Sequence, residues 1–205
     1  MVRIWEPKPL NNAVLDAPAA DGWEDLLAKL KTDDVKANGN GWTLSGGVLV
    51  SPRKSFAALP LGGSYARSSY QMRVTLRSLK QESVFAAILP VADQQVSFLL
   101  DGYPQDGFST SLSGIDGKYR EDVPGAVRGQ QIKDSEPHDL EITVRLSART
   151  VQIVATLDDR PLYEWSGPAT SLNLGKMWSS LPQPTLHLGA GTADWVVSAV
   201  KVKRL

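Results

Sequence analysis

The chain has 205 residues, of which 42% are hydrophobic and 21% are charged, a composition typical of a single globular domain. Lys and Arg together number 22, as do Asp and Glu, so there is no excess of positive charge to favour a nucleic acid or an anionic membrane as partner. The sequence contains no Cys, which excludes a disulfide framework, a thiol nucleophile and any metal site built on thiolates.

The N-terminal residues 1–20 are rich in Pro, Asn and Ala and are interpreted as a tail or linker, with one folded domain expected over residues 21–205. The tail lacks the apolar stretch of about 7 to 15 residues that a secretory signal needs. The longest apolar stretch, residues 84–92, is shorter than the roughly 20 residues that span a bilayer. The sequence therefore predicts neither a signal peptide nor a membrane span. It is compatible with the cytoplasm but leaves the location open.

One helix is expected near the start of the domain, over residues 22–31. Trp23, Leu26, Leu27 and Leu30 recur there at helical spacing, and Asp21 precedes them as a candidate N-cap. No other segment gives a comparable helical pattern, so this short helix is the one expected.

Beyond residue 40 the apolar residues recur with a period of two, which predicts β-strands. In residues 70–77, for example, Tyr70, Met72, Val74 and Leu76 alternate with polar side chains. The expected strands cover residues 41–44, 48–51, 70–77, 84–89, 95–101, 108–113, 140–146, 151–158, 160–165, 185–189 and 195–202.

Three features of these strands predict their arrangement. Residues 84–89 are apolar on both sides, as expected of a central strand covered on both faces. The strands over 140–165 are close enough in sequence to form an antiparallel meander, and residues 189–191 are interpreted as a hairpin turn. Many short strands with one helix predict an all-β, two-sheet antiparallel β-sandwich or jelly roll.

The order of several short motifs then resembles that of a known family. The motifs are Trp23-Glu24-Asp25-Leu26-Leu27, Gly41-Trp42, Gly46-Gly47-Val48-Leu49, Leu99-Leu100-Asp101-Gly102-Tyr103, Ile115-Asp116-Gly117, Val127-Arg128-Gly129, Pro137-His138, Leu181-Pro182 and Leu188-Gly189. Over residues 21–205 the chain resembles the concanavalin A-like lectin and glucanase jelly rolls, related to laminin G-like and keto-disaccharide-hydrolase-like bacterial modules. The resemblance implies two curved sheets with a concave face that often binds sugar.

The sequence offers no catalytic residues. The glucanases of this fold use a Glu-x-Asp-x-(x)-Glu strand, which is missing; the nearest pair, Asp139 and Glu141, is expected to lie solvated on the outward face of a strand. His138 is interpreted as a turn or capping residue and His187 as facing away from the core, and the two are too far apart in sequence to suggest a metal site. No metal or cofactor is predicted.

Loops between strands supply the candidate ligand-binding residues. Sugar sites combine an aromatic face with directional hydrogen-bonding groups. That combination selects Asp101, Tyr103, Asp116, Tyr119 and Arg128, together with Trp178, which is expected to be exposed. Two alternatives remain open. In the first, Asp101 pairs with Arg128 to hold its own loop, and Tyr103 packs on that loop. The second concerns the Asp-Gly pairs that begin at residues 101, 106 and 116, which either form turns or bind calcium.

Three functions follow from these observations. The preferred one is a noncatalytic module that recognises a carbohydrate through loop residues near Asp101, Tyr103 and Arg128. The second is a protein-interaction or assembly module within a larger system. The third, suggested by relatives alone, is a glycoside or keto-disaccharide hydrolase.

Overall fold

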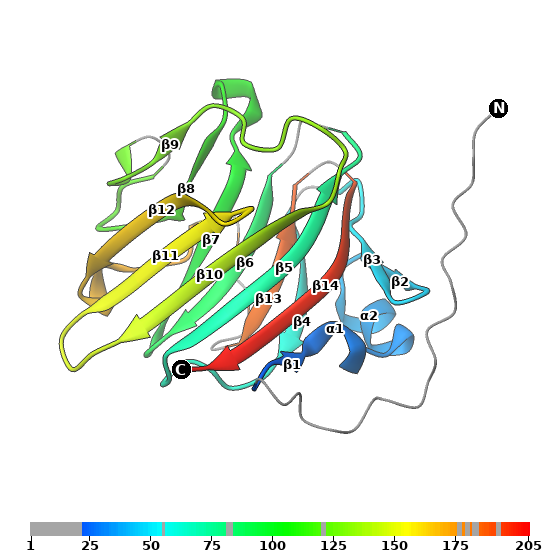
Figure 1. The fold of residues 1–205 in the computed structure, drawn as a ribbon, viewed down its shortest axis with the longest axis horizontal. Helices are drawn as coiled ribbons and strands as arrows, with labels where there is room; N and C mark the ends of the chain where they lie inside the picture. The colour runs from blue at the N-terminus through cyan, green and yellow to red at the C-terminus, as the bar shows by residue number, and fades with distance from the viewer. Residues whose placement is uncertain are drawn as a thin grey trace.

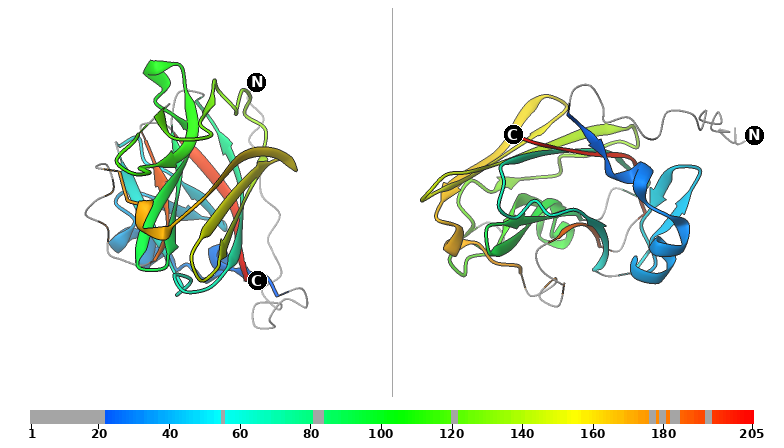
Figure 2. Two further views of the ribbon diagram at one scale, coloured as in Figure 1. Left: turned by 90° about the vertical axis from the view of Figure 1, so that its left-hand side faces the viewer. Right: turned by 90° about the horizontal axis from the view of Figure 1, so that it is seen from below.

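The computed structural model describes residues 22–54, 56–80, 84–119, 122–175, 178, 181, 185–191 and 194–205. The tail expected over residues 1–20 and the candidate cap Asp21 lie outside this range. Within it, two antiparallel sheets are stacked face to face, as Figures 1 and 2 show. No helix in this part of the chain is long and apolar enough to cross a membrane.

The first sheet has eight strands, with β1 (Glu24–Asp25) paired to one strand of the main path. That path runs β12 (Arg160–Gly167), β11 (Val151–Leu157), β10 (His138–Leu146), β5 (Tyr70–Ser78), β14 (Trp195–Arg204), β3 (Val48–Val50) and β2 (Thr43–Ser45). The second sheet has six strands. Its order is β4 (Ala57–Gly62), β13 (Leu186–Ala190), β6 (Phe85–Val91), β7 (Gln94–Gly102), β8 (Ser109–Ser113) and β9 (Val127–Arg128).

The core lies between the sheets and follows the period of two. In β5, Tyr70, Met72, Val74 and Leu76 are at most 1% exposed, while Arg73 between them faces outward. Strand β6 is buried along its whole length, which confirms the expected cover on both faces. Each large apolar side chain removed from water contributes about 1.5–3 kcal/mol, so the alternating strands supply most of the driving force for stacking the two sheets.

The N-terminal helix differs from the sequence prediction. Helix α1 covers only Leu26–Lys29, because Leu30 turns to an extended conformation, and its N-cap is Asp25, whose carboxylate accepts the backbone N–H of Ala28 at 2.9 Å. A second helix, α2 (Thr32–Asn38), was not expected from the sequence. Both helices lie at one end of the sandwich, where they bury Leu26, Leu27 and Val35.

The connections confirm one prediction and overturn another. Strands β10, β11 and β12 form the expected antiparallel meander. Gly189 and Ala190, however, belong to β13 and do not form a hairpin turn. Strands β13 and β14 lie in different sheets, so the chain crosses between the layers after Ala190. A local glycine pattern cannot distinguish such a crossing from a hairpin, because both need a change of chain direction.

Candidate functional site

The six-stranded sheet has an outer face, turned away from the core, that carries mostly small side chains. Cross-strand pairing aligns two rows on this face. One row consists of Pro60, His187, Ile88, Ser97 and Ser113, and the other of Ala58, Gly189, Ala86, Leu99 and Ser111. Apart from His187 on β13, the face is apolar over β4, β13 and β6, and apart from Leu99 on β7 the positions on β7 and β8 are serines.

Trp178 covers the apolar half of the outer face. It packs with Ala58, Val84, Ala86, Ile88 and Leu99, is 1% exposed, and meets the ring of Phe56 edge-on at 5.8 Å between centroids. The expectation that Trp178 is exposed is therefore wrong. The sequence places Trp178 between strands, but only the tertiary structure shows that its side chain lies over the sheet.

Four serines form the hydroxyl-rich half, which we call the serine track: Ser97 on β7 and Ser109, Ser111 and Ser113 along β8. All four are at most 5% exposed. The hydroxyls of Ser97 and Ser113 hydrogen-bond to each other, and that of Ser111 donates to the carbonyl of Leu112. The Oγ of Ser109 and the Oε1 of Gln95, in the described part of the chain, are buried with no hydrogen-bond partner. Such atoms retain the capacity to accept or donate a further bond.

Asp116 and Tyr119 lie at the Ser113 end of the track. The hydroxyl of Tyr119 donates to Oδ1 of Asn173 at 3.4 Å, and the backbone N–H of Asp116 donates to the carbonyl of Ser171 at 2.9 Å. Tyr119 is 36% exposed. We call Asp116, Tyr119, Ser171 and Asn173 the Tyr119 rim. It combines the aromatic ring of Tyr119 and the amide of Asn173 with the exposed residue Asp116, whose backbone is joined to Ser171.

Tyr103 and Arg128 lie at the opposite end of β8. Arg128 is exposed and pairs across strands with Ser109, and the half-buried Tyr103 packs against the Trp178 cluster. The carbonyl of Tyr103 accepts the N–H groups of Asp106 and Phe108, which shapes its own turn. Since Ser109 and Ser113 are four residues apart, the two ends are separated by about 13 Å. The predicted residues thus divide between two ends of one strand.

Asp101 has a structural environment that the sequence did not reveal. Its carboxylate is 2% exposed and accepts the backbone N–H groups of Gln131 at 2.6 Å and Ile132 at 2.9 Å. Burial raises the pKa of Asp101, although the two backbone hydrogen bonds act in the opposite direction. The sequence left open an ion pair between Asp101 and Arg128, but in the structure the Asp101 carboxylate binds the backbone of Gln131 and Ile132. The carboxylate thus holds the segment that follows β9.

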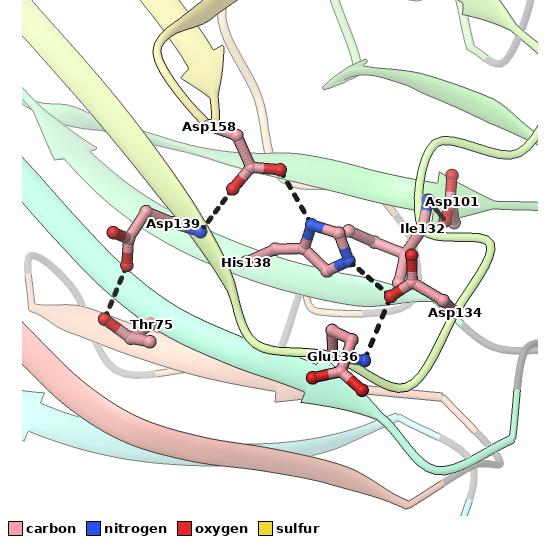
Figure 3. Close-up of polar contacts among 8 residues, drawn as sticks. All are labelled: Thr75, Asp101, Ile132, Asp134, Glu136, His138, Asp139 and Asp158. Carbon is pink, nitrogen blue, oxygen red and sulfur yellow. Dashed lines mark hydrogen bonds and ion pairs between the residues drawn. The ribbon is translucent and has the colours of Figure 1, made fainter.

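The carboxylates considered for catalysis lie on the outward face of a strand, as expected; that strand is β10 of the eight-stranded sheet. Asp139 accepts the hydroxyl of Thr75 at 2.7 Å, as Figure 3 shows, and Glu141 forms an ion pair with Arg73 at 2.6 Å. Each carboxylate is thus engaged with β5. Among the described residues no group of three or more His, Asp or Glu side chains could hold a metal ion.

His187 faces outward from β13, as the sequence predicted, but the outer face is covered and the imidazole is 1% exposed. Its Nδ1 lies 3.0 Å from the carbonyl of Thr185. Burial lowers the pKa of His187, so the neutral imidazole donates this hydrogen bond.

Comparison with solved structures identifies the fold to which this two-sheet arrangement belongs. The chain covers 95% of the carbohydrate-binding module CBM66 from Bacillus subtilis, with 89% of its own length, 12% identity and a TM-score of 0.50. The chain has the concanavalin A-like jelly-roll fold. Two structures of the VIP36 exoplasmic/lumenal domain share it. The Ca²⁺-bound form matches at a TM-score of 0.51 and 12% identity, over 93% of this chain and 88% of that one.

The second VIP36 structure holds Ca²⁺ and Man3GlcNAc. It matches at a TM-score of 0.50 and 13% identity, over 80% of this chain and 81% of that chain. No protein-family model and no curated protein sequence matches the chain. At these identities the likeness concerns the fold. The assignment of a ligand therefore depends on the groups that this jelly roll presents at its own surface.

Proposed function

We propose that this jelly roll is a noncatalytic carbohydrate-binding module that contacts its saccharide at the Tyr119 rim. The observation that carries the proposal is the exposed Tyr119 ring with the Asn173 amide beside it, at one end of the serine track, where Asp116 is also exposed. Two proteins with this fold are named for carbohydrate binding or hold a glycan in their structures, which supports the same class of ligand.

The chemistry of the rim suits a sugar ring. The C–H surface of a pyranose packs on an aromatic face, and its hydroxyls need donors and acceptors at fixed positions. The amide of Asn173 supplies both a donor and an acceptor, and the carboxylate of Asp116 supplies acceptors. Trp178 and the serine track are covered, so they do not offer contacts in this conformation. Tyr103 and Arg128, about 13 Å away along β8, would reach only a longer oligosaccharide.

Calorimetric titration with a panel of neutral and acidic oligosaccharides tests the proposal. Replacing Tyr119 by Ala removes the stacking surface and should weaken binding about tenfold or more, since 1.4 kcal/mol corresponds to a factor of ten. Tyr119→Phe keeps the ring and loses only the hydrogen bond to Asn173, so it should bind between the wild type and Tyr119→Ala.

Leu79→Ala is the control, because Leu79 is a similarly exposed apolar residue, 45% exposed, at the end of β5 in the other sheet. A folded wild-type protein that binds no saccharide would overturn the proposal, as would equal affinities for the wild type and Tyr119→Ala. In the first case, a mass above the monomer by light scattering or a partner that co-purifies would favour the assembly module. Turnover of a glycoside that is lost in Glu141→Gln would favour the hydrolase.

A further inference from the structure

The segment over residues 129–137 crosses from one sheet to the other. It leaves β9 in the six-stranded sheet and enters β10 in the eight-stranded sheet, and we call it the crossover. Its middle is anchored by Ile132, which is 1% exposed in the core, and by the hydrogen bonds from Gln131 and Ile132 to Asp101. Its second half, Lys133 to Pro137, is exposed and depends on other contacts.

His138, the first residue of β10, directly follows the crossover and lies between two carboxylates, as Figure 3 shows. Its Nδ1 is 2.7 Å from Oδ2 of Asp158, in the turn between β11 and β12, and its Nε2 is 3.0 Å from Oδ1 of Asp134 in the crossover. An ionised carboxylate only accepts hydrogen bonds, and a neutral imidazole has a single N–H. Both contacts can therefore be satisfied together only by the doubly protonated, positively charged ring.

The two carboxylates are themselves held in place by backbone groups. Oδ1 of Asp158 accepts the N–H of Asp139 at 2.9 Å, and Oδ1 of Asp134 accepts the N–H of Glu136 at 2.9 Å. The imidazolium therefore links the second half of the crossover to the β11–β12 turn. Asp158 makes the shorter contact and has the less exposed side chain, 46% against 58% for Asp134.

We propose that His138 is a proton-controlled clamp, which when charged fastens the second half of the crossover to the β11–β12 turn and when neutral releases Asp134. The neutral ring keeps its hydrogen on Nδ1, toward Asp158, and turns the lone pair of Nε2 toward the Asp134 carboxylate, which repels it. This inference concerns the crossover and goes beyond the proposed function at the Tyr119 rim.

The charges around the imidazole are mixed in sign. Asp134 of the crossover and Asp158 of the β11–β12 turn contact the ring, and Asp101 at the end of β7 lies near it. Lys133 interacts with Asp101, and Arg160 interacts with Asp158. Glu136, Asp139 and Asp159 are charged neighbours in the sequence, and the Asp139 carboxylate is bonded to Thr75. On β5 the residue opposite His138 is the uncharged Leu76. Partial burial lowers the pKa of His138, but the hydrogen bonds to Asp158 and Asp134 outweigh it and the pKa is raised. This direction agrees with the geometry of two acceptors.

Nitrogen-15 NMR of the imidazole rings tests the clamp in the 205-residue chain. The chain has two His, so the signals are assigned with the single variant His187→Gln. We expect His138 to titrate above the ordinary value of about 6.5 and to form the Nδ1–H tautomer when neutral. Asp134→Asn and Asp158→Asn each retain a side-chain oxygen but remove a charge, and should move the pKa of His138 down toward about 6.5.

Asp159→Asn is the matched control, because it removes a neighbouring charge that does not contact the ring and should shift the pKa least. Heteronuclear relaxation provides a second measurement. The Ser135 and Glu136 amides should be more mobile at about pH 8.5 than at about pH 5.5, on either side of the titration. Any of three results would refute the clamp. They are a neutral His138 ring with its hydrogen on Nε2, a His138 pKa that is the same in Asp134→Asn as in the wild type, and equal mobility of the Ser135 and Glu136 amides at the two pH values.

Discussion

At the scale of single residues, the missing side chain of Gly189 allows Trp178 to lie on the outer face. A Cβ at Gly189 would lie 2.7 Å from Cη2 of Trp178, which is shorter than real Cβ contacts, and 3.0 Å from Cβ of Ala86, which is tighter than most. Because Trp178 also packs edge-on against Phe56, its ring has little freedom to move aside. The identity of one residue on β13 thus determines whether the apolar half of this face is covered.

Replacing Gly189 by Val should therefore lower the free energy of unfolding by about 1–3 kcal/mol through overpacking. Urea unfolding followed by circular dichroism measures the change. Gly175→Ala serves as the control, since its nearest new contact is an ordinary 3.6 Å to Ser113, and it should change the stability by less than about 0.5 kcal/mol. Equal stabilities for Gly189→Val and the wild type would mean that Trp178 does not rest on this strand in solution.

At the scale of elements, the end of the sandwich beside α1 depends on a very short helix. With four residues, α1 has little internal hydrogen bonding, so its Asp25 cap and the burial of Leu26 and Leu27 must hold it. Asp25 also belongs to β1, where it pairs with Lys201 of β14. The cap therefore joins the helix to the eight-stranded sheet.

Asp25→Ala should destabilise the protein by about 0.5–2 kcal/mol, because the N–H of Ala28 loses its acceptor. Asp25→Ser places a capping hydroxyl at the same position and should recover most of the loss. Thermal unfolding monitored by circular dichroism compares the three proteins. If the Ser and Ala variants unfold at the same temperature, the contribution of Asp25 lies in its pairing within β1 and not in the cap.

At the scale of the whole molecule, the two histidines give opposite pH dependences to the stability. The pKa of His138 is raised on folding, so its contribution is complete below about pH 6.5 and is lost as the pH rises through its folded pKa. The pKa of His187 is lowered by burial, so its contribution is complete above about pH 6.5 and is lost as the pH falls through its folded pKa. The wild-type profile near neutrality is the sum of the two.

The difference in the free energy of unfolding between each single variant and the wild type should report the contribution of the histidine that was removed. In His138→Gln the free energy of unfolding should rise with pH between about 5 and 8 relative to the wild type, and in His187→Gln it should fall relative to the wild type. Urea titrations at several pH values measure both differences. Difference curves that are flat, or that have the same sign in both variants, would contradict the opposite environments of the two rings.

The strands were predictable because their pattern is local. The alternation of apolar and polar residues in 70–77 and 140–146 predicts which side chains face the core. The structure confirms this prediction in β5 and β10. The second helix was missed because α2 buries one apolar residue, Val35, and has no stripe of apolar side chains.

The candidate site was only partly predictable from the sequence. The sequence selected Tyr119, but its hydrogen-bond partner Asn173 lies 54 residues further along the chain.

The sequence by itself determined an all-β sandwich with inward-facing aliphatic side chains, since hydrophobic periodicity is carried by consecutive residues. Tertiary structure alone decided that Trp178 is covered, that Asp101 binds backbone N–H groups, and that His138 lies between two carboxylates. Each of these contacts joins segments that are distant in sequence or separated by a turn. They depend on how the strands pair within each sheet and on the path that the loops take over it, which no short sequence pattern records.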